Sequence, residues 1–401
     1  MLEPRQPEQV EAPGAAARRV IVKAGALARE HSVVSFAFPD GVGAEGMPRS
    51  FNLRDAAGRV TPLQVSEDGT AVFILDALGA GQEASFTLEE LAATPAAAVA
   101  AISEDSVVRV RMGASTLFDF QTRGELPVGI DAVYLRGGYI HPLYTPAGVL
   151  VSGDYPVDHY HHHGIWSAWT STDVNGHDVD FWNMAAGLGK VDFSRLDATW
   201  QGPVHAGFQA TLEHTDLVAA VDVTALEERW SVTAYKTHAG DAPFFLFELT
   251  STQELVASSP LNLHAYTYGG FALRGHEQWR DTTQVTILTS EGADRIAADN
   301  RAGRWVAMGG NVGGRTVGVA MLGHSSNFRA PQKLRVSATD PYLAFSPVKD
   351  GAFSIQPGVP YVSRFRFVTF DGPSNPELLN RLWDDFATPP EAHLETPPTA
   401  L

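Results

Sequence analysis

The chain has 401 residues, enough for two domains or for one large sandwich with an appendage. Hydrophobic residues make up 44% and charged residues 19%, which is the composition of a globular protein rather than a disordered one. The absence of cysteine excludes disulfides and thiolate chemistry, and a net charge of -17 disfavours nucleic acids and anionic membranes as partners.

The first residues of the chain predict no folded element. Residues 1–18 are rich in proline and glutamate and are interpreted as a disordered lead-in without the apolar core of a signal peptide. No apolar run is long enough to span a bilayer, so we expect a cytoplasmic protein. From residue 19 to residue 100, short alternating runs separated by glycine and aspartate turns predict a small N-terminal β unit.

Residues 101–387 predict the main domain. Strand patterns dominate it, for example over residues 244–249, 317–322 and 365–370. Residues 376–386 are the exception, because their apolar residues recur at helical spacing behind the capping residue Asn375. Residues 388–401 are interpreted as a proline-rich tail. Many strands and few helices predict an all-β protein, a large antiparallel β-sandwich with a small N-terminal β unit and a C-terminal helix.

Histidines are concentrated in one segment of the main domain. Six of the fourteen lie between His141 and His177. If the segment is extended, His159, His161 and His163 share one face, because side chains alternate along a strand. Residues two apart on a strand are roughly 6.5 Å apart, which lets two imidazoles chelate one ion or flank one sugar.

Three interpretations of this segment stay open. The histidines can be structural, with each side chain hydrogen-bonded within a sheet and no ligand bound. They can hold a divalent metal such as Mn or Zn, with His159, His161 and His163 as ligands. They can also form a metal-free acid/base and sugar-binding site, because imidazole both takes and gives a proton near neutral pH. Tryptophans of the segment would then stack on sugar rings. The candidate binding residues in the segment are Asp158, His162, Trp166, Asn175, Asp180 and Trp182.

Two later stretches add candidates. His324, Asn327 and Arg329 follow an apolar strand, and loop residues at strand ends often carry function because the sheet fixes them. The alternative is a turn that satisfies its own backbone. Arg274 follows an aromatic strand that contains Tyr268, and its guanidinium could clamp a hydroxyl or carboxylate of a substrate. The alternative for Arg274 is a surface ion pair.

Three blocks of sequence resemble one family. The first consists of residues 146–148, 156–166, 174–176 and 180–182, the second of residues 268–274, and the third of residues 305–309 and 317–331. Together they are similar to a soluble bacterial family that carries the label "methane oxygenase PmoA-like" and is a domain of unknown function. The chain departs from the family pattern at His163, where arginine is usual, and at Ser325, where proline is usual. The resemblance implies association with sugar oxidoreductases and isomerases. A galactose-mutarotase-like or related supersandwich fits it by fold analogy.

These observations together predict a carbohydrate-active enzyme whose ligand is a small-molecule carbohydrate. His159, His161 and His163, with His324 opposite them, would carry out acid/base chemistry on a sugar or keto-sugar glycoside, as a lyase, hydrolase or epimerase. One alternative is a carbohydrate-binding or sensing protein without catalysis. The other is a sugar enzyme that depends on a histidine-ligated metal.

Overall fold

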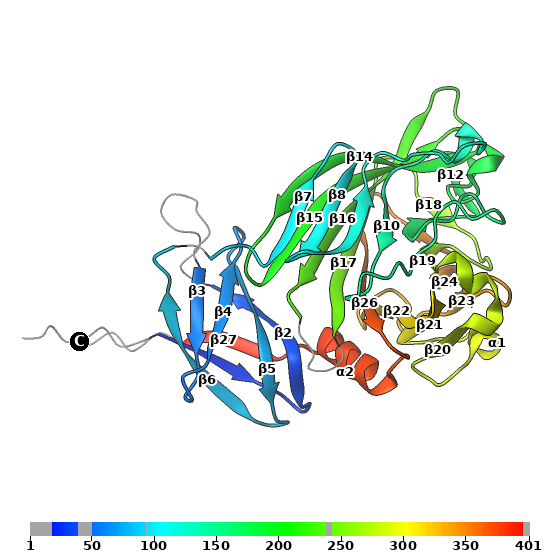
Figure 1. Cartoon of the computed structure of the whole chain (residues 1–401). Helices are drawn as coiled ribbons and strands as arrows, with labels where there is room; N and C mark the ends of the chain where they lie inside the picture. The colour runs from blue at the N-terminus through cyan, green and yellow to red at the C-terminus, as the bar shows by residue number, and fades with distance from the viewer. Residues whose placement is uncertain (1–17, 39–49, 94, 238–242, 396–401) are drawn as a thin grey trace, which may run out of the picture.

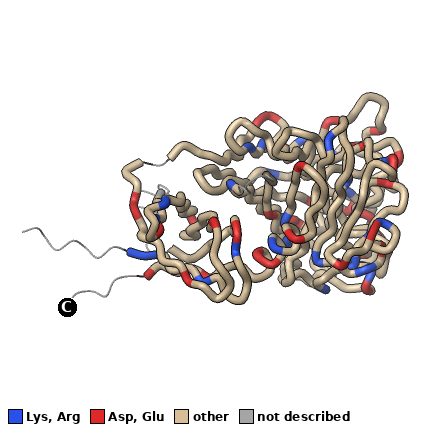
Figure 2. Tube along the Cα trace, turned by 60° about the horizontal axis from the view of Figure 1, so that its bottom comes forward, with Lys and Arg blue, Asp and Glu red and all other residues tan. Residues whose placement is uncertain are grey.

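The computed structural model describes residues 18–38, 50–93, 95–237 and 243–395. Within them most regular structure is β, arranged in four sheets whose strands pair antiparallel. The predicted all-β fold is therefore confirmed. A small β unit lies at one end of the molecule and a larger sandwich at the other, with the C-terminal helix between them (Figure 1). Acidic and basic residues are interspersed along the described part of the trace (Figure 2).

The N-terminal sheet forms the small unit, in the strand order β2-β5-β4-β3-β6-β1-β27. Its strands are β1 (Arg19–Lys23), β2 (Arg29–Ala37), β3 (Ser50–Arg54), β4 (Val60–Val65), β5 (Thr70–Leu78), β6 (Glu83–Glu90) and β27 (Glu391–Glu395). The predicted lead-in lies outside the described residues, apart from residue 18.

The last strand of this sheet corrects the prediction of a C-terminal tail. Residues 391–395 pair antiparallel with β1 instead of extending into solvent. The reason is an alternation in which Ala392 and Leu394 pack against the core of the small unit, while their neighbours face outward. Residues 396–401 lie outside the described residues.

The second sheet, called the site sheet below, has the order β23-β24-β19-β11-β10-β9-β8-β7. Its strands are β7 (Val99–Ser103), β8 (Val107–Met112), β9 (Ser115–Gln121), β10 (Tyr139–Leu143), β11 (Ile165–Ala168), β19 (Gly270–Arg274), β23 (Leu334–Val336) and β24 (Tyr342–Phe345).

The third sheet, called the long-strand sheet, has the order β14-β15-β16-β17-β26-β22-β21-β20. Aromatic contacts such as Phe118 with Phe247 at 4.6 Å and Phe271 with Phe365 at 4.7 Å join it to the site sheet across one large core. Its strands are β14 (Gly189–Trp200), β15 (His205–Asp216), β16 (Val223–Tyr235), β17 (Phe244–Leu255), β20 (Val285–Thr289), β21 (Trp305–Val312), β22 (Arg315–Gly323) and β26 (Tyr361–Asp371).

The remaining elements are short, except for one helix. A four-stranded sheet contains β12 (Thr172–Val174), β13 (His177–Val179), β18 (Leu261–Leu263) and β25 (Phe353–Ile355). The helices are α1 (Arg295–Ala298) and α2 (Pro376–Ala387), with 3-10 turns η1 (Ala132–Tyr134), η2 (Met184–Ala186), η3 (Glu277–Arg280), η4 (Thr282–Gln284) and η5 (Pro347–Asp350).

Helix α2 confirms the predicted C-terminal helix and joins the two units. The side chain of Asn375 caps its first turn by accepting from the backbone nitrogens of Glu377 and Leu378. From its last turn, the buried Asp385 accepts hydrogen bonds at 2.8 Å from Arg29 and at 2.7 Å from Ser32, both on β2. The C-terminal helix therefore ties the small unit to the sandwich (Figure 1).

The two faces of the site sheet have different roles. Phe271 contacts the long-strand sheet, so residues that alternate with it point to the opposite face. Arg274 pairs with Tyr342, and Ala272 pairs with Trp166, which places these side chains on that opposite face. The connection between β10 and β11, which contains the histidines, packs over this face.

Candidate functional site

The histidine segment is a loop, which corrects the prediction of an extended strand. We call residues 154–163 the histidine loop. His159 donates its backbone N–H to the carbonyl of Pro156, and His162 donates to the carbonyl of His159, each at 2.9 Å, so the chain turns twice. It joins β11 directly after Gly164, where a side chain would collide with the carbonyl of Ile140. The expected shared face of His159, His161 and His163 is therefore absent.

The turns bring a different set of histidines together. The ring of His159 stacks on that of His162 with centroids 4.6 Å apart, and His161 meets both edge-on at 5.7 and 4.7 Å. His162 is buried and also stacks on Tyr342 at 4.7 Å. Burial, reinforced by neighbouring positive groups, lowers the pKa of His161 to about 4 and holds the pKa of His162 well below its usual value. Both imidazoles are neutral at pH 7.

A carboxylate and a buried arginine support His159. Nδ1 of His159 lies 2.7 Å from Oδ2 of Asp158, and Nη2 of Arg274 lies 2.9 Å from each oxygen of the same carboxylate. Arg274 is fully buried, whereas the side chain of His159 is 40% exposed. Burial alone would raise the pKa of Asp158, but hydrogen bonding from His159 and the charge of Arg274 outweigh it and lower that pKa. The carboxylate therefore stays ionised.

A second carboxylate, that of Asp340, lies close to this pair, although no sequence pattern singled it out. One ligand atom each from Asp158, His159 and Asp340 lies within 4.8 Å of the other two. Nitrogen and oxygen donors of this kind suit divalent ions such as Mn or Zn. Of the three histidines proposed as metal ligands, only His159 belongs to this group.

His163 points to a separate environment. It is fully buried, with Nδ1 2.6 Å from Oδ1 of Asp154, and its ring stacks on Tyr139 at 4.1 Å. Burial lowers the pKa of His163, although Asp154 opposes that shift. Tyr139 donates its hydroxyl to Oδ2 of Asp154 at 3.1 Å. Sequence reasoning missed Asp154 and Tyr139, because neither has a motif spacing to the histidines.

The tryptophans do not present open faces to a ligand. Trp166 and Trp182 are 1% and 2% exposed and pack on each other with centroids 5.3 Å apart. Trp166 also lies 5.0 Å from His162, so these rings support the histidine rather than form a platform for a sugar. Tyr268 is partly buried against Trp182 at 5.3 Å and donates its hydroxyl to Asn183.

Asn175 and Asp180 have structural roles in this fold. Asn175 adopts a positive φ of 53° in the hairpin between β12 and β13, and its side-chain oxygen accepts from Ser259. Asp180 accepts from the backbone nitrogens of Trp182 and Asn183, which fixes the turn that places Trp182.

His324, Asn327 and Arg329 lie in a third place. His324 contacts Ser326 and, at 4.7 Å, the ring of Phe386 on α2. The side chains of the other two residues mainly bind backbone groups: Asn327 bridges the N–H and carbonyl of Arg364, and Arg329 donates to neighbouring carbonyls. Among the described residues, no hydrogen bond, ion pair or ring contact joins these three to the histidine loop. The predicted placement of His324 opposite the other histidines is not observed.

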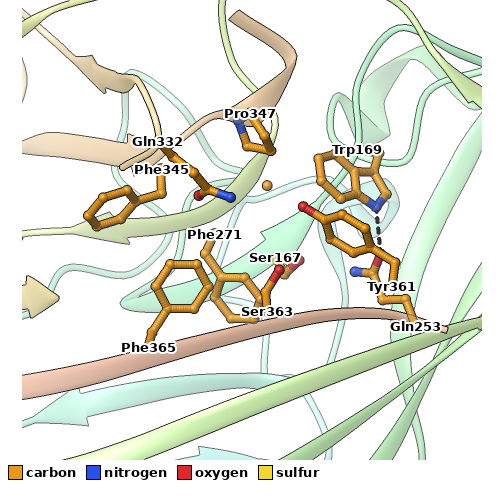
Figure 3. A pocket seen from close by; sticks show the side chains of 11 residues that line it. Ser167, Trp169, Gln253, Phe271, Gln332, Phe345, Pro347, Tyr361, Ser363 and Phe365 are labelled. Atoms are coloured by element: carbon orange, nitrogen blue, oxygen red, sulfur yellow. Dashed lines mark hydrogen bonds between the residues drawn. The ribbon is translucent and has the colours of Figure 1, made fainter. Parts of the chain in front are cut away.

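A cavity of about 10 Å³ lies between the two large sheets (Figure 3). Trp169 on its rim donates to Gln253 at 2.8 Å, while Ser167 and Gln332 each have a buried oxygen without a partner among the described residues. The volume matches one water molecule and is too small for a sugar. This cavity therefore belongs to the core and not to the site.

Comparisons with known proteins give a family and a distant structural similarity. The model of a family of unknown function, DUF6807, matches residues 107–384, so the chain belongs to this family. No curated protein matches the chain. A galactose mutarotase related enzyme from Lactobacillus acidophilus is similar over 69% of this chain and 98% of its own, with 9% identity and a TM-score of 0.22. In the described part of the chain, no helix has the length and apolarity needed to cross a membrane.

Proposed function

We propose that the histidine loop is an acid/base site of a carbohydrate-active enzyme that acts on a sugar or keto-sugar glycoside, as a lyase, hydrolase or epimerase. One observation carries the proposal. His159 is a partly exposed imidazole whose Nδ1 faces a carboxylate that the buried Arg274 holds in place. That carboxylate fixes the ring orientation, and Nε2 is then the atom that exchanges protons with a ligand.

The chemistry follows from this geometry. A keto group makes the neighbouring C–H bond acidic, and Nε2 of His159 is suited to remove that proton. The resulting imidazolium, paired with Asp158, can return a proton to the leaving oxygen when both lie on the same side of the sugar ring. His161 and His162 are neutral and so add no charge that would destabilise the imidazolium.

The choice of a sugar rests on two further grounds. The resemblance to the PmoA-like family implies sugar metabolism, and a net charge of -17 disfavours polyanionic substrates. The buried tryptophans give no support to the choice, since their faces are occupied by other rings.

The test compares His159→Ala with His264→Ala. His264 is a matched control because it is half exposed and lies 2.9 Å from a carboxylate, that of Asp173, to which no arginine is paired in the described structure. Turnover of keto-sugar glycosides is followed by NMR and affinity by calorimetry. We expect His159→Ala to lower turnover about 100-fold or more with affinity retained, and His264→Ala to leave both unchanged. Equal turnover in wild type and His159→Ala would refute the proposal. If wild type binds the ligand but does not turn it over, the result favours a carbohydrate-binding protein without catalysis.

A metal-dependent sugar enzyme is the second candidate, and the grouping of Asp158, His159 and Asp340 favours it. Elemental analysis of untagged protein and thermal unfolding with added Mn or Zn test this candidate. We expect the ion to raise the melting temperature of wild type and to have no such effect on Asp340→Asn. An identical response of both proteins would place any bound ion elsewhere and remove this candidate.

A further inference from the structure

A cavity of about 280 Å³ lies beside the histidine loop, on the side of His163. It is lined by Gln121, Glu125, Leu126, Pro127, Tyr139 and Asp154. Gln121 ends β9, Tyr139 begins β10 and Asp154 begins the histidine loop, so the cavity is formed where these three segments meet. Its volume lies near the lower end of the range for small-molecule sites.

The carboxylate of Asp154 is the fixed group of this cavity. Its Oδ1 accepts from Nδ1 of His163 at 2.6 Å and from the backbone of Tyr155 at 3.1 Å, and its Oδ2 accepts from the hydroxyl of Tyr139 at 3.1 Å. His163 and Tyr139 are at most 1% exposed, so they hold the carboxylate rigidly. A carboxylate oxygen has two acceptor positions, and Oδ2 uses one of them. The second remains for a ligand.

The other lining groups select the kind of ligand. Gln121 donates its amide N–H to the carbonyl of His141, which leaves the side-chain oxygen as an acceptor. Glu125 is exposed and adds a second carboxylate, while Leu126 and Pro127 supply an apolar wall. In the described chain no lysine or arginine lines this cavity or forms an ion pair with Asp154. Acceptors beside an apolar wall suit a molecule with several hydroxyl donors and a C–H face, and two carboxylates repel an anion.

We infer that this cavity is a binding subsite for a neutral sugar unit, with Asp154 as the acceptor for its hydroxyls. The inference rests on the proposed function and deepens it, because the cavity supplies the sugar-holding part of the site that Trp166 and Trp182 do not. The two parts are adjacent in the chain: His163 holds Asp154, and the preceding residue, His162, stacks on His159.

The test measures binding of neutral and anionic sugars to the full chain. Methyl glycosides of glucose, galactose and mannose are compared with glucuronate by saturation-transfer NMR and calorimetry. Asp154→Asn removes the charged acceptor, and Leu126→Trp fills the cavity without altering the carboxylate. Asp222→Asn is the control, because Asp222 is an exposed carboxylate in the connection between β15 and β16.

We expect at least one methyl glycoside to bind more tightly than glucuronate. Asp154→Asn and Leu126→Trp should each weaken that binding about tenfold or more, and Asp222→Asn should leave it unchanged. The inference is overturned if no methyl glycoside binds wild type, or if Leu126→Trp and Asp154→Asn bind it as wild type does. Failure of the acid/base proposal gives a different result. In that case wild type and His159→Ala turn over keto-sugars equally, but sugar binding is still weakened by Leu126→Trp.

Discussion

Arg274 and Asp158 lie 116 residues apart in the sequence, yet one guanidinium nitrogen of Arg274 is 2.9 Å from both carboxylate oxygens of Asp158. Arg274 ends β19 inside the protein, and Asp158 belongs to the histidine loop. The pair therefore fastens the loop to the site sheet. It also sets the ring orientation of His159, which binds the same carboxylate.

Asp158→Asn should destabilise the fold, because it leaves the guanidinium of Arg274 buried without a carboxylate partner among the described residues. We expect the free energy of unfolding to fall by about 3 kcal/mol, as measured by urea denaturation at pH 7. Asp222→Asn serves as the surface control. A variant as stable as wild type would show that the pair contributes nothing to folding.

The contribution of Asp158 should also depend on pH. The pKa of Asp158 is lowered in the folded state, so the pair stabilises the fold above the unfolded pKa of about 4 and loses its effect as the pH falls further. The stability curves of wild type and Asp158→Asn should therefore converge in strong acid. A constant difference between the curves down to the lowest measurable pH would contradict the lowered pKa.

His161 should make stability depend on pH in a second window. Its pKa is lowered from 6.5 to about 4, so between these values the unfolded chain binds the proton more readily and stability falls as the pH decreases. Between pH 7 and pH 4, the free energy of unfolding of wild type should fall by on the order of 3 kcal/mol more than that of His161→Gln. Denaturation at each pH measures both values. An NMR titration of the His161 ring gives the midpoint directly, and a midpoint near 6.5 would rule the effect out.

Deletion of residues 390–401 should weaken the small N-terminal unit. The deletion removes β27, so β1 loses a hydrogen-bonded neighbour and the buried faces of Ala392 and Leu394. We expect the free energy of unfolding to fall by roughly 2 kcal/mol and the β1 amides to exchange hydrogen faster. Truncation after residue 395 retains the strand and is the control. Unchanged exchange in β1 after the longer deletion would mean that β27 does not stabilise the unit.

Asp385→Ala should uncouple the small unit from the sandwich. Asp385 is buried and accepts from both Arg29 and Ser32 on β2, so its removal leaves a buried cation without this partner. We expect the free energy of unfolding to fall by about 3 kcal/mol. In calorimetry, two separate unfolding transitions should replace one. Asn380→Ala, on the same helix and hydrogen-bonded to Trp305 of the sandwich, tests whether any lesion in α2 has this effect. A single transition in Asp385→Ala would show that other contacts couple the units.

The sequence by itself determined many of the regular elements. Short runs bounded by turn residues, such as residues 60–65, form strands as expected, and Asn375 caps the predicted helix. Gly313 and Gly314, at the end of a glycine-rich stretch, form the turn that joins β21 to β22. These features depend on periodicity and on turn or capping residues close in the chain, so local sequence is sufficient to identify them.

Only the tertiary structure decided which groups meet. The dense histidines mark one segment of the sequence, but that segment forms two turns rather than a strand, which bury His162 and His163 and separate His163 from His159. Asp340, from the connection between β23 and β24, and Arg274, from β19, both lie close to Asp158, and β27 pairs with β1 although almost the whole chain separates them. Such contacts depend on packing between remote segments, and no local spacing in the sequence encodes them.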